Sequence, residues 1–395
     1  LLLPAYQVGA EKDRAEETTA VETVEEKNRG EEPIRVGVSL SLQGKYEETS
    51  KNILSSYRMW ARQVNRRGGL LGRPVELIVV DDESKIEKSK EAYRGFFEEP
   101  KVDLVLSPYG TPLTLAVSEI TEQHGYVLIA AAAAGDQIWN RGYDNVFGMY
   151  STGDRFFIGF LDLCAREGME SVSILYEQNP FNRTAANGAY LWAHRMGIDT
   201  VRLFGFRPGG EGIEELWTHV EETNAEALIV SSYPPAGYRS ISYLKKSEYT
   251  PEAVAMAVTP IDPEFSEKAG EAAEGIFAPT MWEPRKQMPF PGTEKFIEDY
   301  REYTGREPTY HAASAFAACR LLEEAVMMTG GIDHEEIREY IVGLDTVTII
   351  GRFKVDHRGK QIGQNPLLIQ WQEGEKEIVY PRSMRTSEPR FGDGK

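Results

Sequence analysis

The 395-residue sequence has few cysteines, no long apolar run and a shortage of positive charge. Its two cysteines, Cys164 and Cys319, allow at most one disulfide and exclude a cysteine-rich metal site. Each lies within an apolar helical pattern, so we expect two buried core thiols. No stretch reaches the apolar length that is needed to cross a bilayer.

The charge balance excludes some partners. The sequence has 44 Lys and Arg against 62 Asp and Glu, a formal net charge of −18. Nucleic acids and anionic membranes bind basic faces, so the balance argues against both. The hydrophobic fraction of 41% is that of a globular chain, and the length suffices for two or three domains.

Motifs for catalysis and cofactor binding are missing as well. No G-x-G-x-x-G follows an expected strand, and neither a Walker loop nor a G-x-S-x-G elbow occurs. We expect His311 and His334 to pack or cap helices rather than to act as bases. The acidic residues 81–83 could bind Mg²⁺, but no second acidic cluster completes such a site, which favours a plain acidic loop. The sequence therefore predicts neither an enzyme nor a cofactor or metal protein.

The first 33 residues differ from the rest. The opening LLLPAYQVGA resembles the end of a secretory signal peptide with its cleavage site, and an arbitrary starting point is the alternative. Residues 11–33 are rich in Glu, Thr and Lys without a hydrophobic period. This composition predicts a solvated, disordered tether.

From Ile34 onward, short apolar runs alternate with amphipathic segments, which predicts a doubly wound parallel sheet. The pattern restarts after Tyr150, so we expect two α/β units of similar size. Further helices and antiparallel hairpins follow residue 284. The expected strands cover residues 34–40, 75–80, 102–107, 126–131, 171–176, 201–206, 227–233 and 253–258.

One loop carries a chemical rationale. Residues 108–112 (PYGTP) follow an expected strand, with Thr111 placed as the N-cap of the next helix and Pro112 as its first residue. The free N–H groups and the positive dipole end of such a helix suit a carboxylate. The loop Ala131–Gly135 has tiny side chains that let a ligand approach the backbone, and Asp136 can cap a short helix there. The alternative is that Thr111 only caps its own helix.

At these segments the chain resembles the type I periplasmic binding proteins, in the branch typified by the leucine/isoleucine/valine-binding proteins of ABC importers. The resemblance implies two Rossmann-like lobes joined by three crossovers, near residues 147–152, 279–283 and 348–352, with the ligand in the cleft between them. It implies lobe 1 as 34–150 plus 282–351 and lobe 2 as 151–281 plus 352–381, with 382–395 as a tail. The likeness rests on the order of IRVGVSLSLQGKY, VNRRGGLLGRPVELIVVDDES, LSPYGTPLTLAVSEI, LIAAAAAGDQIWNRGYDNVF, YHAASAFAACRLLEEA and GRFKVDHRGKQIG.

The resemblance also implies the ligand site. The family's carboxylate-holding hydroxyl falls on Thr111, between Gly110 and the helix, and its backbone carbonyl falls on Ala132. The family's aromatic contacts from the second lobe fall on Phe181 and Tyr233. At strand ends and crossovers facing the presumed cleft, further aromatic contacts are expected from Tyr109 and Trp282. Tyr150 either contacts the ligand or packs at a hinge.

Three positions depart from the family pattern. A threonine of the family falls on Ala134, a tyrosine falls near Thr49, and the acid that pairs with the ligand's ammonium falls near Val258 and Thr259. A buried ammonium without partners costs several kcal/mol, which disfavours a standard branched-chain amino acid as ligand. Asp262 lies near enough in sequence to replace the missing acid.

We therefore expect an extracytoplasmic, periplasmic solute-binding protein. It would capture a small carboxylate-bearing ligand, an amino acid or an aromatic carboxylate, by closure of its lobes. It would deliver the ligand to an ABC transporter permease and act as a monomer, either free or tethered to the membrane by its N-terminus. The alternative is a ligand sensor of the same fold that reports to a receptor or regulator.

Overall fold

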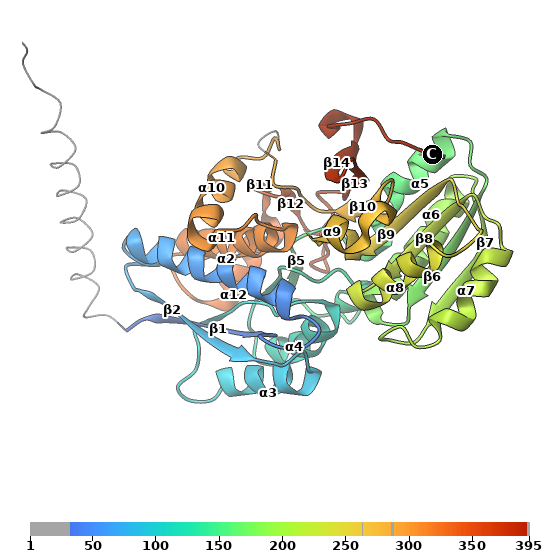
Figure 1. The fold of residues 1–395 in the computed structure, drawn as a ribbon. Helices are drawn as coiled ribbons and strands as arrows, with labels where there is room; N and C mark the ends of the chain where they lie inside the picture. Colours follow the sequence, from blue (N-terminus) through green and yellow to red (C-terminus); the bar gives the residue numbers. More distant parts are fainter. Residues whose placement is uncertain (1–31, 263, 286–287, 393–395) are drawn as a thin grey trace, which may run out of the picture.

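The computed structural model describes residues 32–262, 264–285 and 288–392. They form two α/β lobes that lie side by side, each built on its own β-sheet (Figure 1). The predicted tether, residues 1–33, lies outside the described residues except for its last two positions. Within the described ranges, no helix has the length and apolar character to span a membrane.

The first lobe is built on a parallel sheet with β1 in the middle, between β2 and β3, and β4 and β5 form a further parallel pair. Successive residues of β2 face opposite sides: Leu77 and Val79 pack toward the main core, whereas Ile78 and Val80 join the cluster around α3 and α4. Partial burial on both faces explains why residues 77–80 are all apolar. The elements are β1 (Ile34–Leu40), α2 (Glu47–Arg66), β2 (Val75–Asp81), α3 (Ile86–Phe96), β3 (Leu104–Val105), α4 (Thr111–Gln123), β4 (Leu128–Ala130), the 3-10 turn η2 (Asp136–Ile138) and β5 (Val146–Gly148).

The second lobe holds a seven-stranded sheet in the order β14-β13-β10-β9-β8-β6-β7. Strands β6 to β10 run parallel, and β13 runs antiparallel to both β10 and β14. Its elements are η3 (Gly153–Arg155), α5 (Ile158–Arg166), β6 (Ser171–Glu177), α6 (Pro180–Arg195), β7 (Asp199–Phe206), α7 (Ile213–Glu222), β8 (Ala227–Ser232), α8 (Pro234–Leu244), β9 (Ala253–Val258), η4 (Thr259–Ile261), α9 (Phe265–Ala269), η5 (Gly270–Ala273), β10 (Phe277–Thr280), β13 (Leu367–Gln372) and β14 (Glu375–Tyr380).

Three later helices return to the first lobe, where α10 and α11 (orange) lie over α2 (blue) in Figure 1. The Ser56 hydroxyl of α2 donates to the Ala312 carbonyl of α11 at 2.8 Å, and the Trp60 indole donates to Glu323 at 2.9 Å. These contacts fix α11, and hence its first residues, against the first lobe. The remaining elements are α10 (Thr293–Thr304), α11 (Tyr310–Thr329), α12 (His334–Gly343), β11 (Asp345–Thr348), β12 (Gly351–Lys354) and the 3-10 turn η6 (Arg382–Met384).

The chain passes between the lobes after β5, after β10 and after β12. The third passage lies later in the chain than the predicted residues 348–352, because hydrogen bonds hold residues 359–361 beside β5. The Gly148 N–H donates to the Gly359 carbonyl at 2.8 Å, and the Gln361 amide donates to the Met149 carbonyl at 3.1 Å. The chain enters the second sheet only at Leu367. The predicted lobe boundaries otherwise remain predictions.

The end of the chain packs on the second lobe. The Gln370 side chain donates to the Arg390 carbonyl at 2.7 Å, and the Phe391 ring stacks on Phe277 with centroids 5.3 Å apart. The predicted tail from residue 382 is therefore part of this lobe as far as Gly392.

Candidate functional site

The structure brings seven of the eight predicted site residues to one small cavity between the lobes. The cavity has a volume of about 20 Å³, room for roughly one water molecule. The lobes are therefore closed on each other in this structure. The predicted residues on its wall are Tyr109, Gly110, Thr111, Ala132, Ala134, Phe181 and Tyr233.

Thr111 does not cap its helix, in contrast to the prediction. Gly110 is the N-cap of α4, with a φ of 83° that suits glycine, and Thr111 is the first helical residue. The Thr111 hydroxyl instead accepts from the backbone N–H groups of Gly135 at 3.0 Å and Ala134 at 3.3 Å. The hydroxyl is thus drawn to the small-residue loop, and its own hydrogen remains available to a ligand.

The first turn of α4 keeps donors for an anion. Among the described residues, no backbone hydrogen bond uses the N–H groups of Thr111 or Leu113, whereas the Thr114 N–H donates to the Gly110 carbonyl at 3.1 Å. Two free N–H groups and a hydroxyl therefore meet at the positive end of a 13-residue helix.

Carbonyl groups of the small-residue loop accept hydrogen bonds from other parts of the protein. The Ala132 carbonyl accepts from the Gly110 N–H at 2.9 Å, and the Ala134 carbonyl accepts from the Gly153 N–H at 2.7 Å. The Ala131 carbonyl accepts from the Ser314 hydroxyl. These bonds fix the loop, and each of these carbonyls keeps one lone pair that no other described residue engages.

Aromatic rings form the other walls. Tyr46 packs edge-on against Tyr109 and against Tyr233, with centroids 5.4 and 5.5 Å apart, and Phe181 lies 6.2 Å from Tyr233. Since Tyr233 and Phe181 belong to the second lobe, this cluster joins the two lobes across the cleft. Burial raises the pKa of Tyr109 to about 12, opposed by a hydrogen bond with Thr49, so the phenol stays neutral.

The buried carboxylate of Glu177 positions Tyr233. One of its oxygens accepts from the Tyr233 backbone N–H at 3.0 Å, and the other accepts from the Gly209 N–H at 3.1 Å. Glu177 does not line the cavity. Its charge therefore holds the backbone behind the tyrosine instead of facing a ligand.

No acid stands where the family would pair an ammonium. Val258 lines the cavity, and its φ of 66° is an outlier for a β-branched residue, which marks strain at the cavity wall. Asp262, the possible substitute, accepts from the Tyr238 hydroxyl at 3.0 Å and from the Lys268 ammonium at 2.9 Å, and it does not line the cavity.

Sequence reasoning missed part of the wall. Phe156, Tyr310 and His311 line the cavity beside Tyr150, for which a ligand contact was one of two expected roles. Burial lowers the pKa of His311 to about 3, so its imidazole is neutral at ordinary pH. The available signal was Thr309, a residue type that favours the N-cap, which places Tyr310 and His311 in the first turn of α11.

Trp282 lies outside the cavity, although it was expected at one wall. Its fully buried ring packs edge-on against Phe296 of α10, with centroids 5.8 Å apart. The crossover after β10 carries it into the core of the first lobe.

The other residues singled out in the sequence have structural roles. Cys164 and Cys319 are free and buried, as predicted. Asp82 accepts from the Ser39 hydroxyl at 3.1 Å, and Asp81 accepts from the backbone N–H groups of Leu42, which follows β1, and of Glu83. Within the described ranges, no group of three or more His, Cys, Asp or Glu side chains is placed to hold a metal.

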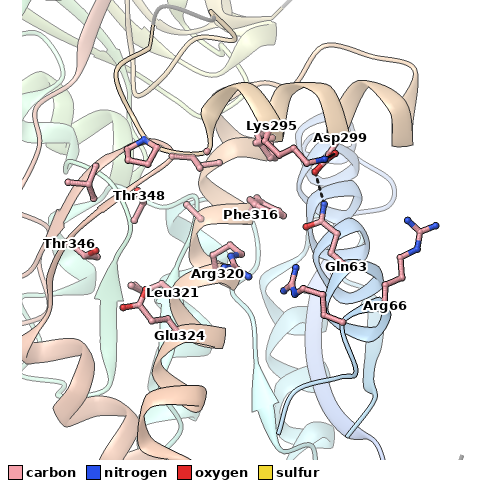
Figure 2. A pocket seen from close by; sticks show the side chains of 17 residues that line it. Gln63, Arg66, Lys295, Asp299, Phe316, Arg320, Leu321, Glu324, Thr346 and Thr348 are labelled. Atoms are coloured by element: carbon pink, nitrogen blue, oxygen red, sulfur yellow. Dashed lines mark hydrogen bonds and ion pairs between the residues drawn. The ribbon is translucent and has the colours of Figure 1, made fainter. Parts of the chain in front are cut away.

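A larger cavity lies elsewhere, on the outer face of the first lobe among α2, α10 and α11 (Figure 2). Its volume is about 710 Å³. Several of its charged side chains have partners: Asp299 accepts from Gln63 at 3.0 Å and from Lys295, and Arg320 pairs with Glu323 beside the cavity at 2.7 Å. The cleft cavity, by contrast, has the unpaired N–H groups at the start of α4 beside it.

A model of the periplasmic binding protein family matches residues 33–376. The chain belongs to the periplasmic binding protein family. The type I fold and the likeness to leucine/isoleucine/valine-binding proteins are therefore confirmed, and this family and fold are those of binding proteins.

Relatives of this periplasmic binding protein are distant but nearly full-length. Leu/Ile/Val-binding protein homolog 7 of Brucella suis is 20% identical over 346 residues, which cover 83% of this chain and 86% of that protein. The structure of the leucine binding protein LivK from Thermotoga maritima superposes with a TM-score of 0.79 at 19% identity, covering 87% of this chain and 97% of that one. A solute binding protein from Rhodopseudomonas palustris in complex with benzoate gives a TM-score of 0.76 at 17% identity, covering 92% and 98%.

Proposed function

We propose that this protein captures a small carboxylate in the cleft by closure of its lobes and delivers it to an ABC importer. The observation that carries the proposal is the unpaired donor set at the start of α4: the Thr111 hydroxyl hydrogen and the N–H groups of Thr111 and Leu113. A carboxylate oxygen is the natural acceptor for such a set.

The ligand body should be apolar and flat, and it should lack an α-ammonium. Tyr109, Phe181 and Tyr233 offer ring faces and edges on the wall. Among the residues that the structure describes, no acid lines the cavity, so an ammonium would find no charged partner there. Of two structural neighbours, the benzoate complex from Rhodopseudomonas palustris holds a ligand of this class, whereas the leucine in the name of the Thermotoga maritima protein carries an α-ammonium and lies outside it.

A ligand must open the lobes to enter, because the closed cavity holds only about one water molecule. The three passages between the lobes are the natural hinges for such an opening. We place the protein in the periplasm as a monomer, in keeping with its family.

The test is calorimetry of the full chain with benzoate, 4-methylpentanoate and leucine. We expect both carboxylates without an amine to bind at least tenfold more tightly than leucine, because Val258 replaces the acid that an ammonium needs. Micromolar or tighter binding of leucine would refute the argument against an ammonium. No binding of any of the three would refute the carboxylate proposal itself.

A further inference from the structure

A second and much larger cavity lies between the lobes, beside the passage that follows β10. Its volume is about 670 Å³, within the range of small-molecule sites, which often lie between domains. The first lobe contributes Arg301 and the start of α11, and the second contributes Ile261 and the hairpin of β13 and β14. Nothing in the carboxylate site uses this space, although Tyr310 belongs to both walls.

Glu283 is the unusual residue of this wall. It is only 4% exposed, and it follows the buried Trp282 in the passage after β10. No hydrogen bond or ion pair reaches its carboxylate from any residue that the structure describes. Burial of a carboxylate without a partner is unfavourable. The group therefore calls for a partner that enters from the cavity.

The cations on the wall are engaged elsewhere. The Arg301 guanidinium pairs with Glu307 through two nitrogens. The Arg285 guanidinium donates to the Lys376 carbonyl and lies 3.7 Å from Glu377. The Lys376 ammonium donates to the Ile261 carbonyl at 2.7 Å.

The charge left over on this wall is negative. Glu267 and Glu375 add two more carboxylates to it, beside that of Glu283. An anion would meet repulsion in this space, whereas a cation would find a counter-ion.

Two aromatic rings define the kind of cation. The Lys376 ammonium lies over the Trp371 ring, 5.6 Å from the centroid, and Tyr310 lies on the wall nearest the cleft. Aromatic faces favour an organic cation over a hydrated inorganic one. The cavity is also far larger than a single ion requires.

We propose that this cavity is a second binding site, for a small primary ammonium compound with the Glu283 carboxylate as its counter-ion. The compound's apolar part lies against Trp371 and Tyr310. The site is separate from the carboxylate site in the cleft, so the two ligands bind without displacing each other.

The experiment titrates the full chain with n-butylammonium chloride by calorimetry, with sodium chloride holding the ionic strength constant. Glu283→Gln keeps the shape of the side chain and removes its charge. We expect a tenfold to hundredfold loss of butylammonium affinity, the size of one charge-assisted bond. The matched control is Glu271→Gln, which removes the same charge from an exposed position in η5, away from the wall. It should bind butylammonium within about twofold of wild type.

Equal affinity of the two variants, or no binding by the wild-type protein, would overturn the proposal. If Glu283→Gln fails to fold, NMR on the wild-type protein decides the question. Butylammonium should then shift the Trp371 indole N–H and the Gly374 amide, which line the cavity, in a saturable way. Unchanged signals would count against the site. Benzoate binding is measured in parallel, so failure of this proposal is distinguishable from failure of the carboxylate site.

Discussion

Replacement of Thr111 by valine tests the chemistry at the start of α4 most directly. Valine keeps the size and the branched shape of threonine, and the side chain is 1% exposed, so the change removes a hydroxyl from a packed place. The hydroxyl accepts from Ala134 and Gly135. In the ligand-bound state its hydrogen would go to a carboxylate oxygen. The substitution therefore affects both stability and binding.

The two effects have different sizes. Leaving the N–H groups of Ala134 and Gly135 unpaired in a buried loop should cost about 1–3 kcal/mol of unfolding free energy. Loss of one charge-assisted bond to the ligand should cost roughly 1.5–3 kcal/mol, so affinity for benzoate should fall about tenfold to a hundredfold. Thr111→Ser keeps the hydroxyl and removes only a methyl group. It should retain most of the affinity.

Calorimetry with benzoate gives the affinity of each variant, and urea denaturation gives its stability. We expect the serine variant to bind within about fivefold of wild type and the valine variant to bind at least tenfold more weakly. Valine binding that equals the wild type would refute the assignment of Thr111. Equal weakening by serine and valine would show that the methyl group, not the hydroxyl, matters.

Two further predictions concern the same cavity. Gly135→Ala should destabilise the protein by about 1–3 kcal/mol, since an added Cβ would lie 2.3 Å from the Thr111 methyl carbon. The loss of stability should be smaller when Gly135→Ala is combined with Thr111→Ser, which removes that methyl group. Purely additive changes in urea denaturation would argue against this contact. Burial holds the pKa of His311 at about 3, below the value of about 6.5 in the unfolded chain, so the unfolded chain takes up the proton first and stability is lost as pH falls below 6.5. His311→Phe should remove this dependence of stability on pH. The difference in unfolding free energy between wild type and variant should therefore change by about 1–2 kcal/mol from pH 7 to pH 5. A difference that stays constant would contradict the prediction.

Much of the fold follows from local patterns in the sequence. The alternation of apolar runs and amphipathic segments from Ile34 onward correctly predicts the parallel strands of both lobes, because a strand buried on two faces must be apolar throughout. The strand β10 was not predicted, because it is short and contains Pro279, a residue type that is rare inside strands. The strand β5 was not predicted either, because it has only three residues.

The composition and the loop motifs of the sequence by themselves determined the fold class, the absence of catalytic motifs and the place of Thr111 at the start of a helix. Tertiary structure decided what the Thr111 hydroxyl bonds to, because its partners Ala134 and Gly135 follow a different strand. It also decided that Trp282 turns into the core while His311 faces the cleft. Such choices depend on how distant segments pack, and a side chain's direction at a crossover is set by its neighbours in space rather than by its neighbours in the chain.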